Sequence, residues 1–410
     1  MEYALTPKQN DVILEYITEE PKITLLSGAK RAGKTYLAIL MYLNHIAQYE
    51  NQGLSFIIGG STQASIRRNI LNDMELFVGE LKLDKTNAVT IFGNKVYCFD
   101  GANADAWKKV RGFTAAGALM NEGTALHDTF VKEVISRCSY EGARIVIDTN
   151  PENPSHSVKT DYIDHDGQRL SNGRLNIKAF NFKLIDNTFL DPEYIESIIA
   201  STPSGMFTER DIHGNWVAAE GAIYKDFDEK RHFIDSIDHS KIVKYFVGVD
   251  WGYEHNGVIV VMGKDAPGAY YLIEEHAERH MEIDYWVNVA KDVQRRYGNI
   301  IFWCDSARPE HIARFRKEDI KAKNGHKNVL HGIETVAKKI KTDQFKVVRK
   351  NAPLFDKEIF MYVWNSDKGE PVKEWDDCMD SVRYAVFSEE ITGHRKSDKS
   401  THDALQSLGL

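Results

Sequence analysis

Short apolar runs alternate with helical patterns over residues 1–220. Several runs are apolar almost without interruption, as is typical of strands in a parallel sheet whose two faces are both covered by helices. The pattern therefore predicts an N-terminal α/β domain with a parallel sheet. The runs expected to form its strands are Ile23–Ser27, Leu54–Gly59, Val96–Phe99, Gly117–Met120, Ile145–Thr149 and Ile177–Phe182.

The pattern changes after Trp216. The next stretch has no long periodicity and is rich in Asp and Lys, so we expect a linker at residues 221–243. Closely spaced strand signals then predict an antiparallel meander that opens a second α/β domain, residues 244–391. The polar residues 392–410 predict a tail that is disordered or ordered only on binding. The elements expected in the second domain are strands at Tyr245–Asp250, Gly257–Gly263, Ala269–Glu274 and Ile300–Cys304 and helices at Ile283–Arg296 and Asp377–Phe387.

One motif in the first domain has a specific chemistry. A loop between the strand Ile23–Ser27 and a helical run matches the phosphate-loop pattern GxxxxGK followed by Ser or Thr in full. In such a loop the backbone N–H groups surround phosphates, the lysine reaches the β and γ oxygens, and the hydroxyl holds Mg²⁺. We therefore expect ATP with Mg²⁺ to bind here. The residues of the motif are Gly28, Ala29, Lys30, Arg31, Ala32, Gly33, Lys34 and Thr35.

Two further strands end in polar residues that suit a phosphate loop. The run Gly117–Met120 is followed by Asn121 and Glu122, and Glu122 is placed to orient or deprotonate the attacking water. Asn121 stands where many such ATPases have a magnesium-holding Asp, so metal binding would fall to Thr35, phosphates and water. Asn150 follows another strand and is a candidate sensor of the γ-phosphate, although Asn-Pro is also a common turn former.

Gln9 fits two compatible roles near the start of the chain. It is a candidate for reading adenine, and it also has the spacing from Thr6 of a helix capping box, which is the simpler role.

Several arginines are candidates for a catalytic cation, because a cation stabilises charge on a transferred phosphoryl group. Arg31 is best placed to do so within its own subunit, whereas most arginines are solvated surface residues. The other candidates are Arg67, Arg68 and, for action on a neighbouring subunit, Arg137.

Carboxylates end different elements of the second domain. Asp250 and Asp305 each end a strand, and Asp380 lies on the last helical pattern, where Asp377 shares its face. Grouped carboxylates repel one another unless a cation neutralises them, and oxygen ligands suit Mg²⁺ or Mn²⁺. This layout is that of a ribonuclease H-like fold with a two-metal site for cutting phosphodiesters. Taken singly, each Asp is more simply a surface residue or a helix cap, and Glu274 is a weaker candidate ligand.

Composition and charge leave these interpretations open. With 42% hydrophobic and 27% charged residues the chain can bury a core, and no apolar run approaches the length of a membrane span. The N-terminus lacks the pattern of a signal peptide, and four scattered cysteines without CxxC spacing argue against a disulfide framework or a zinc site and fit a reducing cytoplasm. A net charge of −8 is mildly adverse to nucleic-acid binding, although basic residues can still line one face.

Over nearly the whole chain these motifs resemble those of the large terminase subunits of tailed bacteriophages. One departure is Asp377, which stands where related sequences often have His. The matching residues are Gln9 for the adenine motif, Gly28–Thr35 for Walker A, Asn121 and Glu122 for the end of Walker B, Thr149–Pro151 for the coupling motif, and Asp250, Asp305 and Asp380 for the nuclease acids.

The resemblance implies a RecA/ASCE-like P-loop ATPase domain joined to a ribonuclease H-like nuclease domain with a mixed sheet. It implies an ATP-driven translocase that moves double-stranded DNA into a procapsid and a metal-dependent endonuclease that cuts concatemeric DNA. The implied partners are DNA, a small terminase subunit, the portal protein and further copies of the chain in a ring, expected to be pentameric. The implied place is the cytoplasm of the bacterial host, with no membrane role.

Two other hypotheses use the same motifs. A helicase-like ATPase fused to a recombinase or resolvase-type nuclease would also combine a phosphate loop with a ribonuclease H-like domain, and strand separation or a preference for four-way junctions would favour it. A non-catalytic hypothesis has the second domain acting only as a DNA clamp, with ATP as a conformational switch. Lack of metal binding and of nicking would favour that hypothesis.

Overall fold

The computed structural model of the chain describes residues 4–407, with side chains up to residue 393. The chain divides into two compact units. The first comprises Met1–Ile199 and Met206–Ala218, and the second comprises Ala200–Gly205 and Ala219–Leu410. In the part that the structure describes, no helix is both long and apolar enough to cross a membrane.

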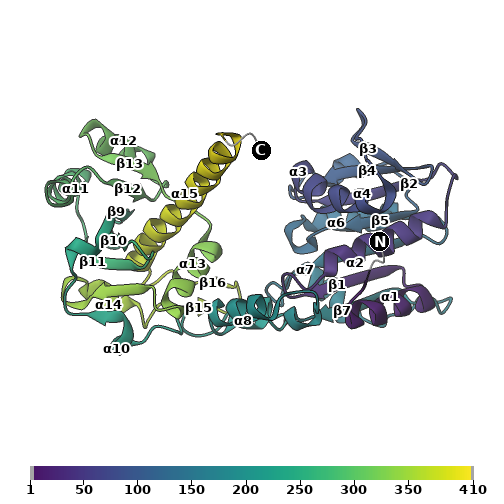
Figure 1. The fold of residues 1–410 in the computed structure, drawn as a ribbon, viewed down its shortest axis with the longest axis horizontal. Helices are drawn as coiled ribbons and strands as arrows, with labels where there is room; N and C mark the ends of the chain where they lie inside the picture. The colour runs from purple at the N-terminus through teal and green to yellow at the C-terminus, as the bar shows by residue number, and fades with distance from the viewer. Residues whose placement is uncertain (1–3, 408–410) are drawn as a thin grey trace. The chain divides into compact units, whose positions relative to one another are not determined.

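A seven-stranded sheet forms the centre of the first unit, with the strand order β3-β4-β2-β5-β6-β1-β7 (Figure 1). Every neighbouring pair is parallel except β3 and β4, which form an antiparallel edge. The predicted parallel sheet is therefore confirmed, and the edge strand β3 is an addition to it. The strands are β1 (Ile23–Gly28), β2 (Ser55–Gly60), β3 (Ala88–Ile91), β4 (Asn94–Asp100), β5 (Gly117–Met120), β6 (Arg144–Thr149) and β7 (Ile177–Phe182).

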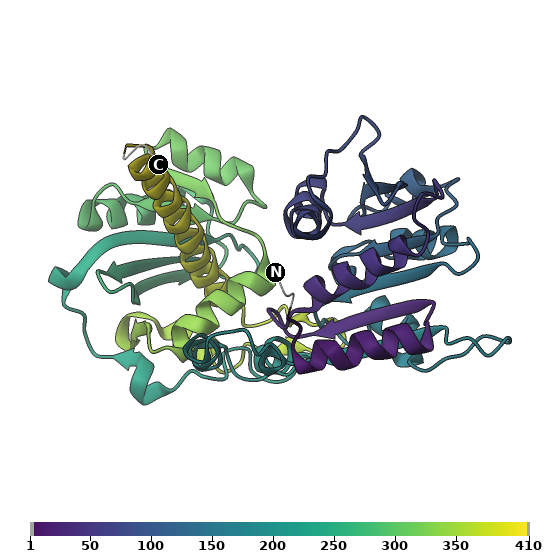
Figure 2. The same ribbon diagram turned by 45° about the vertical axis from the view of Figure 1, so that its right-hand side comes forward.

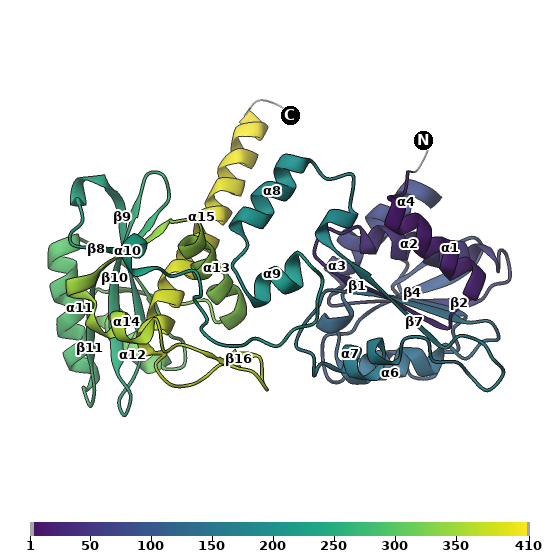
Figure 3. The same ribbon diagram turned by 90° about the horizontal axis from the view of Figure 1, so that it is seen from below.

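Helices cover both faces of this sheet, which explains why its strands are apolar on both sides. Figure 3 shows α1, α2 and α4 on one face and α6 and α7 on the other. Each face has its own core, built around Tyr16 and Leu37 on the first and around Phe130 and Val134 on the second. The helices before the boundary at Ala218 are α1 (Pro7–Glu19), α2 (Lys34–Ala47), α3 (Gln63–Ile66), α4 (Asn72–Val78), α5 (Trp107–Val110), α6 (Asp128–Arg137), α7 (Ser157–Asp161), α8 (Pro192–Ser201) and α9 (Met206–Asp211).

The second unit contains a mixed seven-stranded sheet with the order β13-β12-β9-β10-β11-β14-β8. The predicted meander forms its antiparallel centre, and β12, β13, β14 and β8 extend it with parallel pairs. The strands are β8 (Phe233–Ile234), β9 (Ile242–Asp250), β10 (Gly257–Asp265), β11 (Tyr270–Glu278), β12 (Ile301–Cys304), β13 (Lys321–Asn324) and β14 (Phe345–Val348), beside a ribbon of β15 (Trp364–Asn365) and β16 (Glu370–Pro371).

A long helix, α15, lies across one face of this sheet (Figure 2). Its approach to β9 is close, because a Cβ built on Gly248 would lie 2.0 Å from the carbonyl oxygen of Ser381. The opposite face packs on Trp286 and Phe315 from α11 and α12. The helices of this unit are α10 (Glu229–His232), α11 (Ile283–Tyr297), α12 (Pro309–Lys317), α13 (Val329–Lys341), α14 (Pro353–Glu358) and α15 (Asp377–Ser407).

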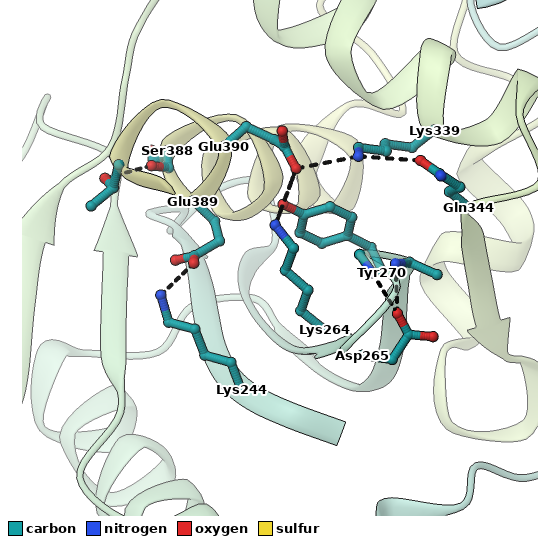
Figure 4. A network of polar contacts seen from close by, with 12 residues as sticks. Lys244, Lys264, Asp265, Tyr270, Lys339, Gln344, Ser388, Glu389 and Glu390 are labelled. Atoms are coloured by element: carbon teal, nitrogen blue, oxygen red, sulfur yellow. Dashed lines mark hydrogen bonds and ion pairs between the residues drawn. The ribbon is translucent and has the colours of Figure 1, made fainter. Parts of the chain in front are cut away.

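Charged contacts fix α15 beyond its apolar face (Figure 4). Glu390 accepts a hydrogen bond from the Tyr270 hydroxyl, and its Oε1 lies 3.3 Å from the ammonium groups of both Lys264 and Lys339. Glu389, which is 4% exposed, is paired with Lys244 of β9. Since buried carboxylates are costly unless they are paired, these contacts fix where the helix lies on the sheet.

Two expected boundaries differ from the structure. The segment 221–243, expected to be a linker, supplies α10 and the edge strand β8, which pairs with β14 through Phe233 and Ile234. β8 owes its structure to pairing with a strand more than a hundred residues away, so the local sequence has no periodic pattern that would predict it. The expected polar tail is helical as far as Ser407, as a continuation of α15, and its last residues, 408–410, lie outside the described part.

Adding a side chain at Gly248 should loosen α15 from the sheet. We expect Gly248→Ala to destabilise the second unit by about 1–3 kcal/mol, because the added methyl meets backbone that cannot rotate away. Guanidinium unfolding followed by tryptophan fluorescence measures the change. Gly393→Ala on α15 is the matched control, since a Cβ added there would have nothing within 4 Å. Equal stability of the Gly248→Ala and Gly393→Ala proteins would contradict this account of the packing.

Candidate functional site

The loop between β1 and α2 has a backbone geometry that requires glycine at two of its positions. Gly28 has φ +143°, and a Cβ there would lie 2.0 Å from the carbonyl oxygen of Phe182 on β7. Gly33 has φ +83° and is the N-cap of α2. A side chain at either position is strained, so the glycines of the motif serve the turn itself. The loop delivers the positive end of α2 to the carboxyl edge of the sheet.

A cavity of about 650 Å³ opens at this edge. It is lined by residues from the loop, from the ends of β5 and β6, and from a π-helical turn, Arg67–Leu71. The polar side chains that line it are Lys30, Arg31, Lys34, Thr35, Tyr36, Arg68, Asn69, Asp73, Asn121, Glu122, Asp148, Thr149, Asn150 and Asn187. The structure therefore brings the loop, Asn121, Glu122 and Asn150 together, as the sequence predicts.

Lys34 is buried at the base of the loop. Its ammonium donates to the carbonyl oxygens of Gly28 (2.9 Å) and Ala29 (2.6 Å) and to Oδ1 of Asn150 (3.0 Å). Burial lowers the pKa of Lys34 to about 8, against the opposing attraction of Asp148 and other nearby acids. A phosphate beside this ammonium would favour its charged form, so the residue suits an anionic ligand.

An acid that the sequence analysis did not assign lies next to Thr35. Asp148, near the end of β6, is buried, and its Oδ2 accepts the Thr35 hydroxyl at 2.6 Å. The Asn121 amide donates to both oxygens of the same carboxylate, at 3.0 and 3.1 Å. Burial raises the pKa of Asp148, and the bonds from Thr35 and Asn121 oppose that rise. The signal in the sequence was an Asp inside an otherwise apolar strand.

Glu122 lines the cavity and has a left-handed backbone, with φ +54°. Non-glycine residues in this region are uncommon and cluster at functional sites. The residue lies two positions beyond the last residue of β5 and is the N-cap of a short 3₁₀ turn, η2 (Gly123–Ala125). Its place beside Lys34 and Thr35 suits a group that orients water at a bound phosphate.

Gln9 forms the predicted capping box. Its Oε1 accepts the Thr6 backbone N–H at 2.9 Å, and the Thr6 hydroxyl accepts that of Gln9 at 3.2 Å. Its Nε2 donates to the carbonyl oxygen of Gly33 at 2.9 Å, which ties α1 to the phosphate loop. Gln9 is not among the residues that line the cavity, so its role in reading adenine stays a prediction.

The candidate arginines fall into two groups. Arg31 and Arg68 line the cavity. Arg67 is paired with Glu75 at 2.8 Å, and Arg137 is paired with Glu133 at 2.6 Å within its own helix. The geometry within the first unit therefore favours Arg31 and Arg68 as cations that could face a nucleotide in this cavity.

The predicted acids of the second unit gather where β9 and β12 end and α15 begins. Asp250 ends β9, and the backbone N–H of Asp305 donates to Val249 beside it at 2.8 Å. The Tyr384 hydroxyl of α15 donates to Oδ1 of Asp305 at 3.3 Å. Asp380 is held by the buried Arg383, with Nη2 3.0 Å from Oδ2. Tyr384 and Arg383 lie on the predicted helix but were not singled out.

These carboxylates are close enough to repel one another. Burial raises the pKa of Asp250 well above its usual range, and repulsion from Asp380 and Asp305 adds to the effect. Within residues 4–393 no three His, Cys, Asp or Glu side chains converge as a ready-formed metal cluster. Arg383 is the cation that neutralises Asp380 in this arrangement. The donor set is oxygen-only and short of positive charge at Asp250, which fits Mg²⁺ or Mn²⁺.

Other acids near the start of α15 have structural partners. Asp377 accepts the backbone and side-chain N–H groups of Asn256, at 3.1 and 2.9 Å. Glu358 accepts the backbone N–H of Cys378 at 2.8 Å, and burial raises its pKa to about 8. Glu274 is paired with Arg296 at 2.6 Å, so it belongs to a separate surface contact.

The two units thus define a class: a P-loop nucleotide-binding unit joined to a mixed-sheet unit with carboxylates at its strand ends. Residues 25–231, just over half of the chain, match the family described as terminase large subunit, T4-like-virus type, N-terminal. The chain belongs to this family of large terminase subunits.

Solved structures agree over both units. The chain is similar to the large terminase of a thermophilic bacteriophage, with a TM-score of 0.78, 25% identity and coverage of 95% of this chain and 99% of that one. A structure of the large terminase from that phage in complex with ADP gives a TM-score of 0.75 at 25% identity, covering 93% and 98%. No curated protein sequence matches the chain. These likenesses confirm the predicted fold class of a P-loop unit followed by a nuclease-like unit.

Removing the charge of Asp250 should stabilise the protein in EDTA, increasingly as the pH rises. A carboxyl group whose pKa is raised on folding contributes stability below its unfolded pKa and loses that contribution as the pH rises through the folded pKa. We therefore expect Asp250→Asn to raise the melting temperature more at alkaline than at acidic pH, by about 2–4 °C for each kcal/mol.

Differential scanning calorimetry in EDTA measures this effect. Asp367→Asn, at an exposed position of the same unit, is the control and should change the melting temperature little at any pH. An Asp250→Asn protein that melts at or below the wild-type temperature in alkaline buffer would show that the charge at this position costs the fold nothing.

Proposed function

We propose that this chain hydrolyses ATP to drive double-stranded DNA into a phage procapsid and cuts that DNA with a metal-dependent nuclease in its second unit. The observation that carries the proposal is the convergence of Lys34, Thr35 and Glu122 on one cavity within the unit that matches the terminase family. Family membership favours this function over the alternative of a helicase-like ATPase fused to a recombinase.

In the proposed ATPase site each residue has a separate task. Bound ATP supplies the phosphoryl group, and Mg²⁺ neutralises charge on its oxygens. Lys34 would exchange its carbonyl contacts at Gly28 and Ala29 for phosphate oxygens while Asn150 holds the ammonium in place. Glu122 would orient the attacking water and accept its proton. Arg31 and Arg68 supply positive charge at the cavity wall.

Gln9 acts on this site through the loop. Its bond to the Gly33 carbonyl fixes the residue at which α2 begins, and therefore the direction of the helix's first N–H groups. The similar phage terminase solved with ADP supports nucleotide binding in this fold. We propose that adenine is read near Gln9, on the side of the loop where α1 begins.

In the proposed nuclease site Asp250, Asp305 and Asp380 would hold Mg²⁺ or Mn²⁺. A pair of such metals activates water and stabilises the leaving oxygen of a phosphodiester. Tyr384 holds the Asp305 carboxylate from α15, and Arg383 holds Asp380 in register with it. Because both come from one helix, the position of α15 sets the spacing of the acids.

The partners follow from the family rather than from a surface of this chain. We propose that copies of the chain assemble as a ring, expected to be pentameric, on the portal protein of the procapsid. A small terminase subunit would select the DNA, and the nuclease would cut concatemeric DNA at the start and end of packaging. This work would take place in the cytoplasm of the bacterial host.

The nuclease proposal is tested with supercoiled plasmid and Mg²⁺ or Mn²⁺. We expect the unaltered protein to nick and linearise the plasmid only with metal, and Asp305→Ala to lower the rate by at least about 100-fold, since the metals lose a ligand by which they are positioned. Agarose gels resolve the products. Cutting by Asp305→Ala at the wild-type rate would remove this carboxylate from the site.

A variant in one unit serves as the control for the activity of the other unit. Lys34→Ala should abolish ATP hydrolysis, measured as phosphate release, and leave plasmid cutting unchanged. Asp305→Ala should retain ATP hydrolysis. Loss of both activities in both variants, with unchanged melting temperatures, would mean that the two units do not act as separate catalytic sites.

A further inference from the structure

The ATPase site lacks an acid at the position where one is ordinarily found. In P-loop ATPases an Asp at the end of the strand before the catalytic Glu helps to hold Mg²⁺ together with the loop hydroxyl. Here that position is Asn121, whose neutral amide donates hydrogen bonds and offers the cation no charge. Either the metal is held without a carboxylate, or the carboxylate comes from elsewhere.

The neighbouring strand brings a carboxylate to the same point. β5 and β6 are parallel, with Met120 opposite Ile147, so the next residues along each strand are Asn121 and Asp148. Both side chains are buried, and the amide of Asn121 lies 3.0 and 3.1 Å from the two oxygens of Asp148. The carboxylate also accepts the Thr35 hydroxyl, at 2.6 Å.

We propose that Asp148 is the acid of the ATPase metal site and that Asn121 is its aligning partner, so that acid and amide have exchanged strands. This inference rests on the proposed ATPase function. By accepting a hydrogen bond from the Thr35 hydroxyl, Asp148 directs the lone pairs of the Thr35 oxygen away from itself and toward the cavity. It thereby acts as a positioning residue whose charge also favours a divalent cation beside Thr35.

The energetics of burial support a functional role. A carboxylate is expensive to hold in the interior, and a strand end could satisfy the same backbone with an apolar residue. Asp148 accepts hydrogen bonds from Asn121, Thr35 and the backbone of Glu122, and it attracts Lys34 across the loop. Each of these groups belongs to the nucleotide site, so the cost of the buried charge is partly offset by residues that face the ligand.

The exchange places two functions on one strand. Asp148 holds Thr35, and two residues later Asn150 holds the Lys34 ammonium at 3.0 Å. The end of β6 therefore contacts both the hydroxyl that faces the metal and the lysine that faces the γ-phosphate. A shift of this strand end on ATP hydrolysis would change the contacts of both Thr35 and Lys34. The coupling motif Thr149–Pro151 would thus be linked directly to the nucleotide site.

The test measures how Mg²⁺ changes the affinity of the full chain for the slowly hydrolysed analogue ATPγS, by calorimetry in excess Mg²⁺ and in EDTA. We expect Asp148→Asn to weaken binding in Mg²⁺ by about 10- to 100-fold, the usual loss when an outer partner of a metal ligand is removed. Binding in EDTA should change much less, because no metal is then present for the Thr35 hydroxyl to hold. Asp161→Asn, on α7 of the same unit, is the matched control and should leave both affinities unchanged.

A second variant separates the proposed role from a merely structural one. Asn121→Asp/Asp148→Asn restores the acid to the usual strand while keeping the amide–carboxylate pair, so the effect of Mg²⁺ on ATPγS affinity should return. An equal loss of affinity in Mg²⁺ and EDTA for Asp148→Asn, or a folded double variant without a Mg²⁺ effect, would overturn the proposal. Failure of the unaltered protein to bind ATPγS at all would instead refute the ATPase function on which the proposal rests.

Discussion

Holding a carboxylate at the end of a strand, wholly or partly out of water, is the constraint on which both units depend. In the first unit the carboxylate of Asp148 accepts hydrogen bonds from Thr35 and Asn121. In the second unit Asp250 faces other carboxylates, and its pKa is raised by burial and by their repulsion. In the first arrangement hydrogen bonds offset part of the cost of burial, whereas in the second the neighbouring carboxylates add to it, so Asp250 gains most from an added cation.

The topology of the two sheets explains how these carboxylates come to lie at the strand ends together. Parallel strands bring their carboxyl ends to one edge, so residues far apart in the sequence meet there without long loops. β1, β5 and β6 deliver the phosphate loop, Glu122 and Asp148 in this way. In the second unit the edge has acids from β9 and β12, and α15 completes it from the face of the sheet. The close contact at Gly248 and the ion pairs of Glu389 and Glu390 therefore bear on the proposed nuclease site as well as on stability.

The sequence predicted most of this because buried strands and phosphate loops are local patterns. The runs at Gly117–Met120 and Ile177–Phe182 match β5 and β7 at both ends. Asp148 was missed because its partner is fixed by the register of β5 against β6, which no local pattern encodes. β8 was missed for the same reason, since its two residues gain their structure only from pairing with β14. The pairing of Asp380 with Arg383 has helical spacing, but its burial depends on the surrounding unit.

Both sites hold charged groups in position through contacts within the protein. Lys34 is bound by two loop carbonyls, and Asp380 is bound by Arg383. A phosphate at Lys34 therefore gains only the difference between its own contacts and the carbonyl contacts that it displaces, whereas Arg383 keeps Asp380 positioned. An ATPase must release its product in every cycle. Side chains that are already positioned by protein contacts suit such an enzyme, because they stay in place when the ligand leaves. The same argument explains why Asn150 matters: it stays on Lys34 whichever partner occupies the other side of the ammonium.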